Sequence, residues 1–149
     1  MTDDNAKDKK LYEKSRQIET SKARINSLSG EVSMLEQRLA DLERLLALTT
    51  DAFAAYSYGA SRIDDRLSLL SSLREMVISA AGAQNLLSEA LTGTPVRRAA
   101  YQAEDGIGLL RNRVNNTYDD LEASRNRLRQ ARNDLDRLNY EYDNISRET

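Results

Sequence analysis

The first half of the chain carries apolar residues at a regular spacing of seven positions. A second apolar row follows three residues behind part of the first, so the two rows form the a and d positions of heptads. This pattern predicts a long amphipathic helix of the coiled-coil type. The first row holds Leu11, Ile18, Ile25, Val32, Leu39 and Leu46, and the second holds Leu28, Leu35 and Leu42.

The same periodicity continues through the middle of the chain, and we therefore predict one helix over residues 11–91. Residues 1–10 are polar and charged and are predicted to be a disordered N-terminus. Within the helix, Gly59 and its neighbours at 57–61 form a candidate kink, because glycine weakens a helix interior.

The C-terminal third repeats the heptad pattern and predicts a second long helix over residues 97–147. Two polar residues, Thr117 and Ser124, interrupt its second row. The first row holds Ile107, Val114, Leu121, Leu128, Leu135 and Tyr142, and the second holds Leu110, Ala131, Leu138 and Ile145.

A turn between the two helices is predicted at residues 92–96, just after Leu91. Gly93 suits the left-handed position that ends a helix, Thr94 suits an N-cap, and Pro95 suits the first position of a new helix.

These elements predict a single all-α domain over residues 1–149, folded as an elongated antiparallel helical hairpin. A fold-back near Gly59 is the alternative, and it would give a three-helix bundle.

A hairpin that turns at residues 92–96 lays its second helix along residues 42–91 and leaves residues 11–41 as an overhang. The apolar seam of this overhang is costly to expose to water, at about 25 cal/mol per Å². We therefore predict that the seam binds a helix of another protein or of a second copy. Its residues are Leu11, Ile18, Ile25, Val32 and Leu39.

Composition removes most catalytic chemistry, because the chain has no Cys, no His and no Trp. Thiolate nucleophiles, Ser-His-Asp triads and zinc fingers are thereby excluded for this chain alone. The carboxylate pairs lie at solvent-facing heptad positions. We expect no catalytic residue, no cofactor and no metal site, and hence no enzyme.

The charge balance argues against nucleic-acid binding, because 22 Lys and Arg stand against 24 Asp and Glu. The N-terminal residues lack the apolar stretch of a signal peptide, and no apolar window is long enough to span a membrane. The expectation is a cytoplasmic protein without membrane insertion.

The order of parts resembles the WXG-type helical hairpins of Gram-positive type VII secretion. Leu91 stands where that motif has its Trp, Gly93 matches its Gly, and Tyr101 corresponds to the downstream aromatic. Among these proteins, the chain looks most like the small helical proteins that accompany LXG toxins.

The resemblance also implies an export signal of the form Tyr-x-x-x-Asp/Glu on the second helix. Two segments of the chain have this form, Tyr101 with Asp105 and Tyr118 with Glu122. A spacing of four residues places the ring and the carboxylate on one helical face.

This resemblance implies a non-enzymatic adaptor or chaperone that binds the helical domain of an LXG-type toxin, alone or with a second small helical protein. Such an adaptor assists export of the toxin from the cytoplasm. Co-secretion of the adaptor with the toxin, without a Sec signal peptide, is the alternative to a cytoplasmic location. The alternative is a homo-oligomeric coiled-coil scaffold, which the β-branched residues of the first heptad row favour.

Overall fold

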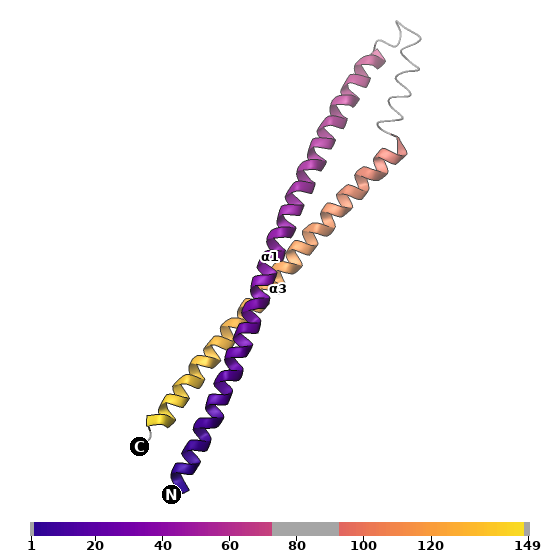
Figure 1. The fold of residues 1–149 in the computed structure, drawn as a ribbon. Helices are drawn as coiled ribbons and strands as arrows, with labels where there is room; N and C mark the ends of the chain where they lie inside the picture. Colours follow the sequence, from indigo (N-terminus) through magenta and orange to yellow (C-terminus); the bar gives the residue numbers. More distant parts are fainter. Residues whose placement is uncertain (1, 73–92, 148–149) are drawn as a thin grey trace. The chain divides into compact units, whose positions relative to one another are not determined.

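The computed structural model describes residues 2–72 and 93–147, which form two long α-helices (Figure 1). Helix α1 spans Thr2–Ser72 and helix α3 spans Thr94–Arg147. The described residues contain no strand. The two helices pack against each other, and the predicted all-α fold is confirmed.

Helix α1 begins earlier than predicted and shows no interruption at the glycine. It starts at Thr2, so the described part of residues 1–10 is helical. It also passes through Gly59, where an added Cβ would meet no atom within 4 Å. A lone glycine costs a helix about 1 kcal/mol, which does not by itself end it. The fold-back at this position is absent, and residues 73–91 of the predicted helix lie outside the described residues.

Helix α3 starts at Thr94, three residues before the predicted start at residue 97 and within the predicted turn at 92–96. The carbonyl oxygen of Gly93 accepts hydrogen bonds from the backbone N–H groups of Val96 and Arg97, both at 3.1 Å. Gly93 thus acts as the N-cap of α3, one residue earlier than the predicted Thr94. Pro95 lies in the first turn, where its missing N–H costs nothing. Leu91 and residue 92 lie outside the described residues.

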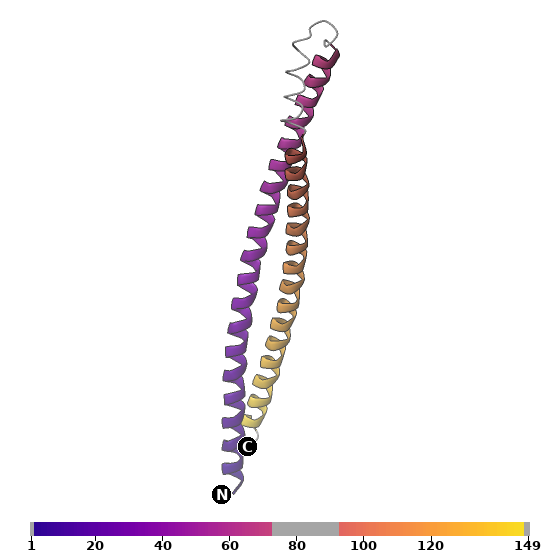
Figure 2. The ribbon, with the colours of Figure 1, turned by 90° about the vertical axis from the view of Figure 1, so that its right-hand side faces the viewer.

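The chain divides into two compact units, and each contains a stretch of both helices. Unit 1 comprises Met1–Ala40 and Asn115–Thr149, and unit 2 comprises Asp41–Val114. In unit 1, the start of α1 runs antiparallel beside the end of α3, with the two chain termini at the same end (Figures 1 and 2).

The core of unit 1 contradicts the expected overhang. Leu28 packs with Leu128 and Ala131, and Ile25 and Val32 pack against this cluster. The N-terminal part of α1 is therefore covered by the C-terminal part of α3, and not left without a neighbour. The heptad rows of both helices face each other there, which buries the apolar area that an overhang would expose.

Candidate functional site

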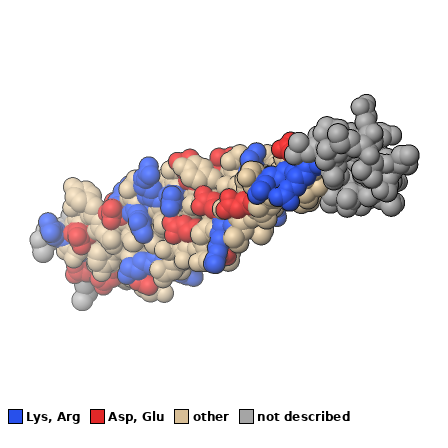
Figure 3. Space-filling view, turned by 90° about the horizontal axis from the view of Figure 1, so that it is seen from above, with Lys and Arg blue, Asp and Glu red and all other residues tan. Residues whose placement is uncertain are grey.

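The carboxylates of the described residues do not gather into a metal site. None of them forms a group of three or more Asp and Glu that is able to hold a metal ion. No helix of the described part of the chain is long and apolar enough to cross a membrane. On the face shown in Figure 3, charged side chains of both signs are interspersed. Contact surfaces are therefore the candidate functional sites of this chain.

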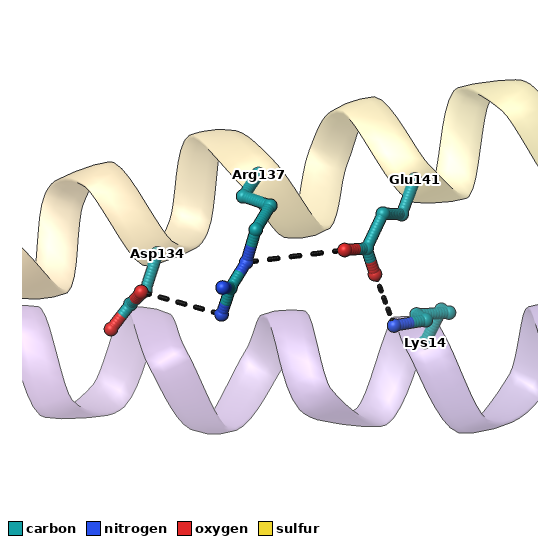
Figure 4. Close-up of polar contacts among 4 residues, drawn as sticks. All are labelled: Lys14, Asp134, Arg137 and Glu141. Carbon is teal, nitrogen blue, oxygen red and sulfur yellow. Dashed lines mark hydrogen bonds and ion pairs between the residues drawn. The ribbon is translucent and has the colours of Figure 1, made fainter.

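Unit 1 joins its helices with charged side chains at the edge of the core (Figure 4). Lys14 of α1 donates a hydrogen bond to Glu141 of α3, and Arg137 lies 3.9 Å from the same carboxylate. Arg137 also pairs with Asp134 at 3.4 Å. The hydrogen bond from Lys14 lowers the pKa of Glu141 below its ordinary value of 4.5; desolvation opposes this shift, and the charges of Lys14 and Arg137 add to it.

A polar layer crosses the core of unit 1 at Ser124, whose side chain is fully buried. Its hydroxyl donates a hydrogen bond of 2.8 Å to Glu31 on α1. The Arg127 guanidinium donates to the same hydroxyl at 3.0 Å and to Glu31 at 3.3 Å. Among the described residues, every buried side-chain N or O atom has a hydrogen-bond partner. The buried polar side chains of unit 1 therefore have their hydrogen-bond partners within the chain.

The predicted partner-binding seam lies largely inside this unit. Ile18 is buried, and Leu11, Ile25, Val32 and Leu39 are half-buried. Since Ile25 and Val32 already contact the core shared with α3, these two side chains have their apolar neighbours within the chain. Because α3 covers this part of α1, the seam does not need a second chain to bury its apolar residues.

Unit 2 contains an open apolar groove of about 470 Å³ between its two helices. Four of its eight lining residues are alanines, whose small side chains leave the groove open. The lining residues are Thr49, Ala52, Phe53 and Tyr56 from α1 and Val96, Ala99, Ala100 and Ala103 from α3.

The surface beside the groove is also apolar. Leu45 and Leu48 of α1 keep 49% and 60% of their area exposed. Asp51 is the only charged residue in the sequence between Arg44 and Arg62. The heptad pattern alone does not distinguish this stretch from the rest of α1, whereas its lack of charged residues does.

The candidate export-signal residues lie on the surface of α3. Tyr101 and Tyr118 are 68% and 51% exposed, and Asp105 and Glu122 are exposed as well. Tyr101 and Asp105 line a shallow hollow in unit 2 together with Arg97, Arg98 and Gln102. The structure thus leaves both pairs accessible on the helix.

No family model, curated protein or solved structure matches this chain. The resemblance to WXG-type hairpins has no support from these comparisons and stays a prediction.

Proposed function

We propose that this chain is a non-enzymatic adaptor that binds an amphipathic helix of a partner protein in the groove of unit 2. The single observation that carries the proposal is the groove itself, an apolar hollow of about 470 Å³ that is open to solvent. Unit 1 holds the two helices together, and unit 2 offers the surface.

The shape of the groove favours a helix as the ligand. Two antiparallel helices form its walls, and Ala52, Ala99 and Ala103 leave room for large side chains from outside. A helix with apolar residues at positions i, i+3, i+4 and i+7 presents such side chains in one row. Burying them in the groove gains about 25 cal/mol per Å² of apolar surface.

The narrower part of the proposal comes from the resemblance to type VII secretion proteins. It identifies the partner as the helical domain of an LXG-type toxin, with this chain as a chaperone and targeting factor. The helical hairpin and the exposed pairs Tyr101–Asp105 and Tyr118–Glu122 are compatible with that role. Export of the complex through these pairs is part of the proposal.

The alternative function, a homo-oligomeric scaffold paired along the N-terminal seam, has lost its main support. Its residues Ile25 and Val32 contact the core formed with α3. A scaffold built on this seam would first have to separate the two helices of unit 1.

Two exposed alanines of α1 provide a matched test. Ala52 lines the groove and Ala54 does not. We expect Ala52→Glu to abolish binding to the purified helical domain of an LXG-type toxin, measured by calorimetric titration. Ala54→Glu should bind as the wild type does. Equal binding by both variants would refute the groove as the binding site. A wild-type chain that binds no such toxin would refute the LXG-type toxin as the partner.

A further inference from the structure

Helix α1 carries a second heptad seam in unit 2, separate from the row that faces α3. Its members are spaced alternately by three and four residues, as a coiled-coil seam requires. Leu45, Leu48, Ala52 and Ala55 are exposed. At Gly59, an added Cβ would meet no atom within 4 Å. The seam consists of Leu45, Leu48, Ala52, Ala55 and Gly59.

The side chains of the seam are large at its N-terminal end and small at its C-terminal end. A second copy that runs antiparallel to the first brings the leucines of each chain opposite the alanines of the other. Leu45 then meets Ala55 of the second copy, and Leu48 meets Ala52 of the second copy, which also lines the groove. This contact is isologous, because a twofold axis near residue 50 generates both halves from the same residues.

Charges at the two ends of the seam are complementary in the same arrangement. Asp41 precedes the seam by one further step of four residues, and Arg62 follows it by one step of three. In the antiparallel pair, Asp41 of the second copy lies opposite Gly59. Arg62 lies about one helical turn beyond Gly59. Its guanidinium lies over the Tyr58 ring, 5.8 Å from the ring centre.

From the size gradient, we infer that a second copy of this chain packs along this seam and contacts Ala52 at the edge of the groove, in a twofold antiparallel dimer formed by unit 2. Ala52 belongs to both the seam and the groove, so the second copy and the partner helix compete. In this one respect the inference rests on the proposed function. Self-association then shields the apolar surface until a partner replaces it, so that partner binding converts dimers into heterocomplexes.

The absence of cysteine from the chain allows a direct test. A single Cys introduced as Ala52→Cys lies near the twofold axis, whereas Ala54→Cys lies on the opposite face of α1. A short bis-maleimide should therefore cross-link Ala52→Cys into a dimer within minutes and leave Ala54→Cys at least tenfold less linked. Sedimentation equilibrium of the wild type should give twice the chain mass of 16.8 kDa.

Leu48→Glu should give a monomer with unchanged helical circular dichroism, which separates loss of the dimer from loss of the fold. A monomeric wild type, or equal cross-linking at both cysteines, would overturn the inference. The two proposals fail separately. A monomer that still binds the toxin domain refutes only the dimer, and a dimer that no toxin domain dissociates refutes only the adaptor.

Discussion

Units 1 and 2 contain the same two helices with the same heptad spacing, but they fill the contact differently. Unit 1 buries Ile18, Leu28, Leu121 and Leu128 and adds ion pairs such as Glu36–Arg125, at 2.7 Å. In unit 2, Ile107 is the one buried apolar side chain among the described residues. There alanines line the contact and leucines stand on the outside.

The difference separates stability from binding. Large residues that interlock between α1 and α3 hold unit 1 together, since burial of each gives about 1.5–3 kcal/mol. Unit 1 also has a hollow, but polar and charged residues line most of it. In unit 2, four of the eight residues that line the groove are alanines, and the groove is apolar. A periodic pattern thus specifies the helices in both units, and the size and polarity of the side chains decide whether an apolar surface stays open to another helix.

The largest expected effect on the free energy of unfolding comes from a substitution in the contact between α1 and α3 in unit 1. Leu121 is 3% exposed, and Leu121→Ala should lower the free energy of unfolding by about 2–5 kcal/mol in urea denaturation. The matched variant in unit 2 is Leu45→Ala, which should change it by less than about 0.5 kcal/mol. Similar losses in the two variants would show that both units contribute equally to stability.

A middle-sized effect is expected at the polar layer of unit 1. Ser124→Ala removes the hydroxyl that donates to Glu31 and accepts from Arg127, and should cost about 1 kcal/mol relative to Ser27→Ala, an exposed control. The comparison uses two serines of helices, so the difference in helix propensity cancels. Urea denaturation at neutral pH measures both, and equal values would mean that the layer does not stabilise unit 1.

The smallest effect concerns pH. The pKa of Glu141 is lowered in the folded protein, chiefly by the hydrogen bond from Lys14, so its ionised form stabilises unit 1. This contribution is present above the ordinary pKa of 4.5 and is lost as the pH falls through the lowered folded value. The melting temperature of Glu141→Gln should approach that of the wild type as the solution is acidified. A constant gap between the two proteins down to the lowest pH would contradict this assignment.

The sequence predicted the helices well because their signals are local. Heptad rows give the extent of a helix, and Gly93 with Pro95 locates the start of α3. The sequence did not predict which residues of α1 lie beside which residues of α3. In the structure, Val96 and Tyr56 line the same groove, whereas the predicted hairpin placed Val96 beside the residues just before Leu91.

The groove was missed for a related reason. Ala52, Ala99 and Ala103 belong to none of the predicted heptad rows, so periodicity did not mark them as residues that line a groove. The hollow forms because small residues of α1 lie opposite small residues of α3. Local periodicity contains no information on that pairing.

The polar layer at Ser124 also bears on how the chain avoids misfolding. A heptad repeat permits a hairpin that has slipped by seven residues and still buries apolar rows. Slippage in either direction would replace Glu31 with Arg24 or Arg38, which lie seven residues on each side of it. Arg127 would then face a like charge, and the buried hydroxyl of Ser124 would lose its carboxylate acceptor. Slipped pairings therefore dissociate faster than the native one, and the layer acts during folding as a check on alignment.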